Sequence, residues 1–287
     1  MIQIIKKSAL LFAMSTFTFI GAFAQNDSVN TDFEFKNRTG RFSFYWGYNR
    51  AVYSKSTIHF NGPNYDFTVY DVTGSDRPTK LSWTYVRPGL ITIPQYVYRI
   101  GFNVTDRVQL SAGLDHMKYV VDVNQTALMS GVITADASTK YQGNYLNVPI
   151  VLSPDFLEFE HSDGYNMVSL DVEYNYPFLR FAKNTLRLNA MGGIGGIFIV
   201  AKTKVSVLGY GLDNNWHMSG FTLNAKAGLK LEYKNHLFAI AALRGGYSSL
   251  YDVLIHNEAP DRAEHNLSYL EGFAAIGTYF RCWKPRK

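Results

Sequence analysis

Two short polar clusters in the chain combine residue types that can do chemistry. Residues 115–118 read Asp-His-Met-Lys, and residues 160–164 read Glu-His-Ser-Asp-Gly. A histidine held by a carboxylate can act as a general base towards a serine hydroxyl or a water molecule, which is the minimum equipment for ester hydrolysis. The two clusters therefore predict a hydrolytic site, provided that the fold brings them together.

The candidate catalytic residues are His161, His116, Asp115, Asp163, Ser162 and Ser54. His161 and Ser162 are adjacent, so in a strand their side chains would point to opposite faces. Ser54 is therefore included as an alternative to Ser162. A second interpretation needs no catalysis, because the same polar residues could cap loops and bind lipopolysaccharide phosphates or water.

Strands must position these residues, and the clearest strand pattern lies at residues 221–233. Every odd position there is apolar, and every even position is polar, glycine or charged. A period of two indicates a strand with two different faces. Phe221 and Tyr233 place aromatic rings at the two ends, and the segment is long. These features favour a strand of a transmembrane β-barrel, with one face towards lipid and the other towards the interior.

The same alternation predicts seven further strands, at residues 41–48, 94–104, 108–115, 166–176, 186–200, 237–247 and 268–280. Short turns at 105–107, 177–184 and 234–236 alternate with long loops at 61–93, 122–164, 201–219 and 248–267. That asymmetry is typical of bacterial barrels with short periplasmic turns and long external loops. The sequence predicts an all-β, antiparallel, up-and-down transmembrane barrel of eight strands with long extracellular loops.

Two of the long loops contain strand-like sequence, at residues 65–73 and 145–152. The second reads Tyr-Leu-Asn-Val-Pro-Ile-Val-Leu. It resembles the Tyr-Leu-Glu-Ile-Pro-Leu-Leu-Leu stretch of a large family of small bacterial outer-membrane β-barrel proteins, from which it departs at Asn147. In that family the segment spans the membrane, so the resemblance implies ten to twelve strands. The alternative is a β-hairpin that projects above the membrane.

The inward faces of the predicted strands collect five basic and five acidic residues: Arg99, Arg187, Lys226, Lys230 and Arg244 against Asp115, Asp171, Glu173, Glu232 and Glu271. Buried charges are tolerated when they are paired or hydrated, so this balance predicts an ion-pair network that fills a narrow lumen. Eight strands enclose only enough space for side chains. The glycine run at 192–196 lacks the spacing of a dinucleotide site and is interpreted as a thinned strand.

The N-terminus has the features of a cleavable signal peptide. Lys6 and Lys7 precede an apolar run, and Ala22-Phe23-Ala24 provides a small-x-small cleavage site after Ala24. The predicted domains are therefore a signal peptide at 1–24, a periplasmic lead-in at 25–40 and an outer-membrane barrel at 41–287. The export signal and the barrel pattern together indicate the outer membrane of a Gram-negative bacterium.

Composition excludes several other classes of function. Without Lys6 and Lys7 of the predicted signal peptide, 26 basic residues stand against 23 acidic ones, and a formal charge of +3 is too small and too dispersed to indicate nucleic-acid binding. Cys282 is the only cysteine, so thiol-based metal sites and internal disulfides are excluded. The histidines lack metal-ligand spacing, and no cofactor is expected. The expected partners are outer-membrane lipids and lipopolysaccharide, with the barrel-assembly machinery during insertion; the sequence sets no oligomeric state.

The arrangement of the two polar clusters resembles that of outer-membrane phospholipase and lipid A deacylase barrels, which carry a histidine and a serine at the lipid-facing rim. The resemblance is one of geometry, because those enzymes commonly use a His-x-Ser motif. The sequence predicts a barrel that acts through its extracellular loops in surface binding or envelope integrity. The alternatives are an outer-leaflet lipid hydrolase or acyltransferase with a histidine-based rim site, and a narrow channel for small solutes.

Overall fold

The computed structural model describes residues 33–80, 82–83, 94–213, 215–256 and 260–282. The predicted signal peptide, its cleavage site after Ala24 and residues 25–32 of the predicted lead-in lie outside the described residues. Within the described ranges the secondary structure is β-sheet, with no α-helix.

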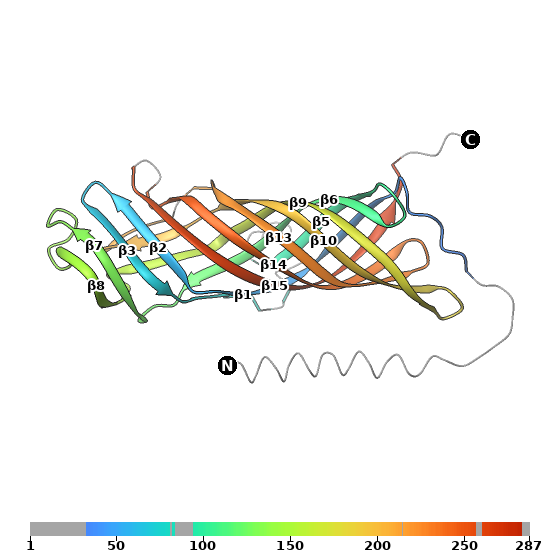
Figure 1. Ribbon diagram of the computed structural model, residues 1–287, viewed down its shortest axis with the longest axis horizontal. Helices are drawn as coiled ribbons and strands as arrows, with labels where there is room; N and C mark the ends of the chain where they lie inside the picture. The colour runs from blue at the N-terminus through green and yellow to red at the C-terminus, as the bar shows by residue number, and fades with distance from the viewer. Residues whose placement is uncertain (1–32, 81, 84–93, 214, 257–259, 283–287) are drawn as a thin grey trace.

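Eight antiparallel strands close into a ring (Figure 1). In order around the ring they are β1 (Phe42–Tyr53), β5 (Tyr96–Asn103), β6 (Val108–Val121), β9 (Leu157–Phe181), β10 (Leu186–Ala201), β13 (His217–Tyr233), β14 (Leu237–Leu254) and β15 (Arg262–Phe280). β1 pairs with β5 on one side and with β15 on the other, which closes the barrel. The predicted eight-stranded, up-and-down barrel is confirmed.

Several ring strands are longer than the alternation predicts. β9 has 25 residues, against the predicted span of 166–176, and it continues through Pro177 to Phe181. The predicted turn at 177–184 is therefore wrong, because the chain reverses at residues 182–185, where Ala182, Lys183 and Asn184 have positive φ. We call the end of the barrel that holds this turn and the β13–β14 turn the base.

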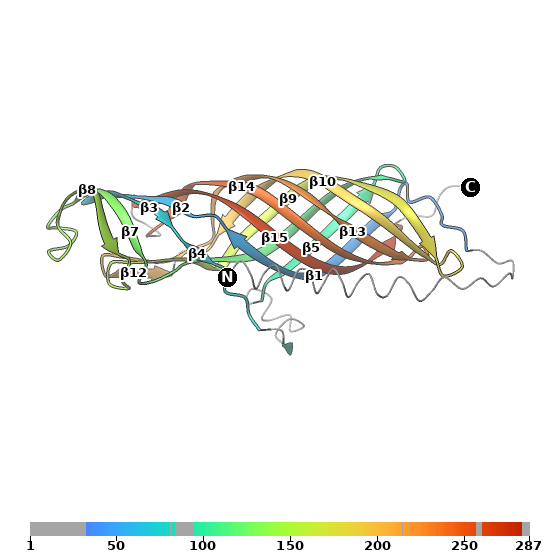
Figure 2. The same cartoon turned by 60° about the horizontal axis from the view of Figure 1, so that its bottom comes forward.

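The long loops are mostly strands, and they extend the sheet at the end opposite the base (Figures 1 and 2). They are β2 (Ser56–Gly62), β3 (Tyr65–Val72), β4 (Gly74–Ser75), β7 (Thr126–Ile133), β8 (Gly143–Val151), β11 (Lys204–Val207) and β12 (Tyr210–Asp213). β2, β3, β7 and β8 continue the sheet outward from β15, and β11 pairs with β9. None of these seven strands joins the ring.

The segment that resembles a membrane-spanning family strand therefore has a different place here. β8 pairs with β7 alone in the described chain, and β3 lies between β2 and β7. The implied count of ten to twelve barrel strands is wrong for this chain. Both segments belong to hairpins that project beyond the barrel, which is the alternative left open by the sequence.

The outer surface of the ring changes character part of the way up each strand. Towards the base the outward side chains are apolar, and Leu223 and Ile276 expose 68% and 69% of their surface. On β9 this apolar band ends at Val168, above which Glu158 and Glu160 face outward. On β15 it ends at Leu270. We call the part from the base to this level the lower barrel, and the part beyond it the head.

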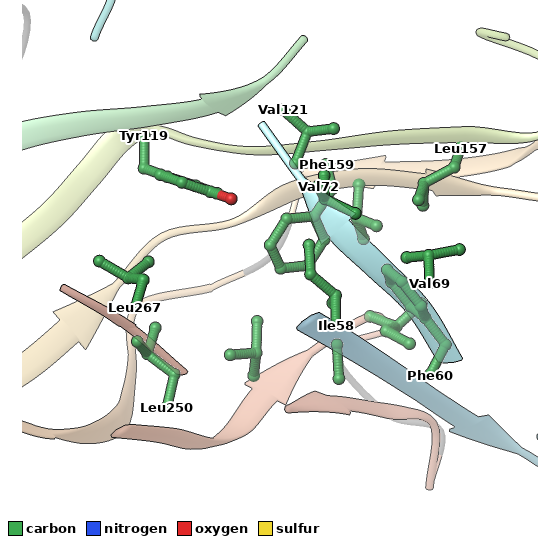
Figure 3. Close-up of a cluster of buried hydrophobic side chains, with 14 of the residues drawn as sticks. Ile58, Phe60, Val69, Val72, Tyr119, Val121, Leu157, Phe159, Leu250 and Leu267 are labelled. Atoms are coloured by element: carbon green, nitrogen blue, oxygen red, sulfur yellow. The ribbon is translucent and has the colours of Figure 1, made fainter. Parts of the chain in front are cut away.

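The interior changes in the opposite sense at the same level. The head encloses a large cluster of buried apolar side chains, among them Ile58, Phe60, Val69 and Phe159, all at most 1% exposed (Figure 3). These side chains come from the projecting strands and from the upper halves of the ring strands. The interior of the lower barrel is largely polar and charged. The fold is therefore apolar outside and charged inside in one half, and polar outside and apolar inside in the other.

Candidate functional site

The lower barrel holds the charged residues that the inward faces predict, and all ten are buried. Asp115 is the centre of one group: Arg99 donates to its Oδ2 at 2.7 Å, and Arg244 also donates to it. Arg244 in turn lies 3.4 Å from Glu271 in an ion pair, and Glu271 accepts a hydrogen bond from Asn49 at 2.8 Å. One carboxylate thus serves two guanidinium groups from different strands.

A second group surrounds the ammonium of Lys226. Its Nζ lies 3.2 Å from Asp171 Oδ2 and 2.6 Å from Glu173 Oε1. Ser111 donates to the same Glu173 oxygen at 2.6 Å. These contacts join β6, β9 and β13, so the ion pairs link three strands across the interior. Pairing of this kind offsets the large cost of removing each charge from water.

Two glycines make room for these long side chains. Gly113 lies opposite Arg99 in the β5–β6 pair, and a Cβ at this position would clash with the guanidinium. Gly195, inside the glycine run at 192–196, lies opposite Asp171, and a Cβ there would clash with the carboxylate. The glycines therefore give the buried charges space next to the barrel wall.

Arg38 closes the base of the barrel, a role that the sequence did not reveal. Its guanidinium is 1% exposed and donates from Nη1 to Glu232 Oε1 at 2.8 Å, while its backbone N–H donates to Asp106 at 2.9 Å. Arg187 and the Tyr279 hydroxyl hold the same Glu232 carboxylate, each at 2.6 Å. Residues 33–41 thus form part of the barrel floor.

Among the five basic residues of the predicted set, Lys230 is the one that forms no ion pair within the described residues. Its ammonium lies 5.2 Å from the ring centre of Phe238 and 6.0 Å from that of Tyr279. These distances are typical of cation–π contacts, which stabilise a charge less than a close carboxylate does. Glu232 is paired with Arg187 and also with Arg38, which lies outside the predicted set of ten charges.

The catalytic candidates do not converge. Asp115 faces the interior and belongs to the ion-pair network, whereas the His116 side chain lies on the opposite face of β6, where it is buried with 1% of its surface exposed. The His116 ring stacks on Tyr96 at 5.4 Å, and its Nδ1 lies 2.7 Å from Asn166 Oδ1. Since successive residues of a strand point to opposite faces, Asp115 cannot orient His116. The carboxylate–histidine pair predicted from residues 115–118 is therefore not formed.

The second cluster is divided in the same way. His161 points into the head core, while Ser162 faces outward and donates to Glu160 at 3.0 Å. Asp163 faces outward too and lies 3.4 Å from Lys202. The structure brings neither hydroxyl nor carboxylate of this cluster to the His161 ring.

Ser54 is also separate from the histidines. It is exposed in the turn between β1 and β2, where its Oγ accepts a hydrogen bond from Ser268 N–H at 2.9 Å. The geometry required for general-base hydrolysis is a hydrogen bond between base and nucleophile. The six predicted catalytic residues do not provide it, because their side chains are divided between the interior and the outer surface.

His161 instead pairs with His265, a residue that the sequence analysis left among unrelated histidines. Their Nε2 atoms lie 3.2 Å apart, and Thr203 Oγ1 lies 3.0 Å from His161 Nδ1. Burial in the apolar core lowers the pKa of His265 to about 3 and that of His161 well below its usual range. Both rings are therefore neutral at pH 7, and one donates to the other. The pair is buried in the core; both nitrogens of His161 have partners, while His265 Nδ1 has none.

The signals for the missed residues are weak in the sequence. Arg38 and Glu232 are 194 positions apart, and His161 and His265 are 104 apart. No local period connects such residues. The one usable signal is the alternation of side chains along a strand, which places His161 of β9 and His265 of β15 on the inward face.

The described residues hold neither a metal-binding cluster nor a membrane-spanning helix. They contain no group of three or more histidine, cysteine, aspartate or glutamate side chains placed to hold a metal ion. They also form no helix that is long and apolar enough to cross a membrane.

The tip of the head presents an unusual surface. All nine residues of β8 are at least partly exposed, and Leu146 exposes 82% of its surface. Leu128, Val132, Val148 and Val151 each expose 40–49%. Exposed apolar groups outside a lipid band commonly mark a site of interaction. β7 and β8 lie at the far end of the molecule from the base (Figure 1).

Comparison with known proteins finds similarity in structure. No protein-family model matches the sequence, and no curated protein does. The chain is similar to the outer-membrane protein OprG from Pseudomonas aeruginosa, with 10% identity, a TM-score of 0.40, and coverage of 85% of this chain and 98% of OprG. It is also similar to AlkL, solved in lipid bilayers, with 10% identity, a TM-score of 0.37, and coverage of 92% and 100%.

A third similar structure is Neisserial surface protein A, with 8% identity, a TM-score of 0.34, and coverage of 85% of this chain and 99% of that protein. The first two are described as outer-membrane proteins and the third as a surface protein. Similarity at this level identifies neither a ligand nor an activity of this chain. Function has to be argued from the surfaces and the interior described above.

Proposed function

We propose that the chain is an integral outer-membrane protein in which a closed barrel anchors a folded head, and that the head acts in binding at the cell surface. The observation that carries this proposal is the reversal of polarity between the two halves. An apolar exterior suits lipid, and a polar exterior around an apolar core suits water.

The outer wall of the lower barrel supports membrane residence. On β13 the apolar alternation covers residues 221–233, more than the roughly 9–11 residues that a tilted strand needs to cross a bilayer. Aromatic side chains lie at both limits of the band. Near the base, Arg107 lies over the Tyr176 ring at 5.6 Å and Lys234 over the Tyr233 ring at 5.1 Å. Aromatic and basic residues are favoured at the level of lipid head groups.

The interior of the protein favours the function of an anchor rather than that of a channel. Ion pairs cross the lumen of the lower barrel, Arg38 closes the floor, and the apolar core fills the head above. A diffusing solute would have to displace several buried, paired charges, which is costly. The hydrolase alternative has no support in the geometry, because its candidate residues lie on opposite faces of the wall.

The base is expected to face the periplasm and the head the outside of the cell. The segment of residues 33–41 lies at the base, on the side from which an exported chain would enter the membrane. The short turns lie at the same end, as in bacterial barrels with short periplasmic turns. The head is then the part that external partners meet.

The test combines two measurements on the purified protein with one in intact cells. Unboiled protein should migrate differently from boiled protein on a detergent gel, because a closed sheet resists detergent until it is heated. In planar bilayers it should show no discrete conductance. In intact cells, a cysteine introduced at Ser130 in the head should react with an impermeant maleimide, while Cys282 near the base should not. A protein that stays in solution without detergent would contradict the proposal.

A further inference from the structure

The free edge of the head sheet lies at β8. The sheet order ends with β3, β7 and β8, and the opposite side of β8 has no neighbouring strand in the part of the chain that the structure describes. Such an edge carries backbone N–H and C=O groups that point outward and can pair with another strand. A lipid or a sugar does not offer alternating donors and acceptors at strand spacing, whereas an extended polypeptide does.

This edge lacks the charges that usually protect an edge strand. β7 and β8 contain no aspartate, glutamate, lysine or arginine. The head has another strand with a single neighbour, β12, which serves as a comparison. β12 has four residues and ends in Asp213, which lies opposite Lys204 of β11. The β12 edge is short and flanked by charges, as natural edges commonly are; the β8 edge is longer and neutral.

We propose that the β8 edge pairs with the β8 edge of a second copy of this chain, so that two heads join tip to tip. A neutral strand can meet its own copy without repulsion, whereas a charge at the two-fold axis would face the same charge of the other copy. The pair is isologous, with a two-fold axis at Leu146 that places each Leu146 opposite its counterpart. The proposal rests on the orientation of the head outside the cell given above.

The direction of the strands decides how the two copies approach. Copies in one membrane are related by rotation about an axis along the barrel, which would leave the two β8 strands pointing the same way. An antiparallel pair needs an axis across the barrel, and that axis puts the two bases on opposite sides. The geometry therefore points to copies in two facing membranes, which is contact between cells.

Two features of β8 limit the strength of each contact. β8 has an extra residue at Leu146 and Asn147 relative to β7, and Asn147 adopts a φ of 52° and gives its N–H to Ser130 Oγ at 2.9 Å. Pro149 provides no N–H, but with the axis at Leu146 it lies opposite Gly143, at the end of the pair. A single contact is then weak, and many parallel contacts between two surfaces gain from multivalency.

The test uses phosphatidylcholine vesicles at 0.15 M salt, carrying the full chain. The head-out fraction is measured first, as the share of Cys282 that an impermeant maleimide cannot reach from outside. Vesicles with outward heads should cluster with each other, seen as a several-fold rise in particle size, and should not cluster with protein-free vesicles. Clustering with protein-free vesicles would mean that the tip inserts into lipid, which would overturn the proposal.

Charge variants at the two-fold axis make the test specific. Leu146→Lys and Leu146→Glu should each lose self-clustering, and mixing vesicles of the two variants should restore it. Tyr210→Lys, on the β12 edge and 67% exposed in the parent, is the matched control and should cluster like the parent. Self-clustering by Leu146→Lys, or no recovery in the mixture, would overturn the pairing.

The outcomes separate this inference from the proposed function. Heat-modifiable migration and a head-out population show that the barrel and its orientation are intact in each variant. If both of these results are obtained and the parent vesicles stay dispersed, the proposal of self-pairing is wrong, while the proposed function of an anchored head is not contradicted. If migration does not depend on heating, the proposed function itself fails.

Discussion

The lower barrel and the head are stabilised from the inside by opposite kinds of side chain. In the lower barrel the solvent is lipid, so the outer wall is apolar and the strands are held together inside by ion pairs such as Lys226 with Glu173 at 2.6 Å. In the head the solvent is water, and a core around Phe60 and Phe159 replaces the ion pairs. The comparison teaches that the medium outside the wall decides what can fill the inside.

The first and largest prediction breaks the interior of the lower barrel. Asp115→Leu removes the carboxylate shared by Arg99 and Arg244 and leaves two buried guanidinium groups short of a partner. The free energy of unfolding should fall by about 3–5 kcal/mol, as when one partner of a buried ion pair is removed. Urea unfolding in lipid vesicles measures the loss.

The matched control for this prediction is Asp163→Leu, which removes an exposed carboxylate 3.4 Å from Lys202. Exposed pairs contribute roughly 0–1 kcal/mol, so the change should stay in that range. Equal losses in the two variants would show that burial does not separate the two kinds of ion pair.

The second prediction concerns the head and its response to acid. The folded-state pKa values of His161 and His265 lie below the value of about 6.5 for an unfolded histidine. Between pH 6.5 and about 3 the unfolded chain binds protons that the folded head does not, so stability is highest above pH 6.5 and falls as the pH drops. The slope should approach about 1.4 kcal/mol per pH unit for each histidine.

Hydrogen exchange at pH 7 and pH 5, corrected for the intrinsic exchange rate, measures this effect for each half. Amides of the head should lose protection while those of the lower barrel keep theirs. The double variant His161→Leu, His265→Leu should reduce the difference between the two pH values. An unchanged pH response in that variant would assign the effect to the surface histidines.

The third prediction tests the floor of the barrel. Arg38→Ala removes the hydrogen bond to Glu232 and leaves that carboxylate with Arg187 and Tyr279. Hydrogen bonds to charged groups contribute about 1.5–3 kcal/mol, and the loss should lie in that range. The loss of stability is measured as a decrease in the temperature at which the protein changes its migration on a gel. Lys36→Ala, which keeps the backbone N–H bond to Asn235, should leave that temperature unchanged.

The fourth and smallest effect is expected at Lys230. This ammonium is buried and lies in no described ion pair, so Lys230→Met keeps the volume and removes a charge that has no close carboxylate partner. Replacing a buried charge by an apolar group of similar size is often neutral or stabilising. The free energy of unfolding should stay within about 1 kcal/mol of the parent or rise. A loss as large as that of Asp115→Leu would show that Lys230 belongs to the network.

The sequence predicts the lower barrel well because the signal is local. In β13 the polarity of each residue from Phe221 to Tyr233 indicates which face of the strand it occupies. The inward charges follow from the same alternation. The eight ring strands were all identified in this way. Their upper ends were not, because β9 continues to Leu157 through residues such as His161, whose polarity does not fit an apolar core.

The candidate site was predicted less well, and the reason is physical. The parity of His161 and Ser162 correctly placed them on opposite faces, but nothing local shows that His161 meets His265 or that Arg38 meets Glu232. Those contacts depend on how the ring closes and on which residues it brings together across the interior. The place of the 145–152 segment outside the ring depends on the same closure.

The continuity of β9 has a mechanical consequence. This strand runs for 25 residues from the base into the head; it pairs with β10 over residues 165–181 and with β6 over residues 165–174 and 160–161. A force applied at the tip would load these ladders along the strand direction, so that many hydrogen bonds would have to break together. Tension at the tip would therefore reach the membrane as a pull on the whole barrel.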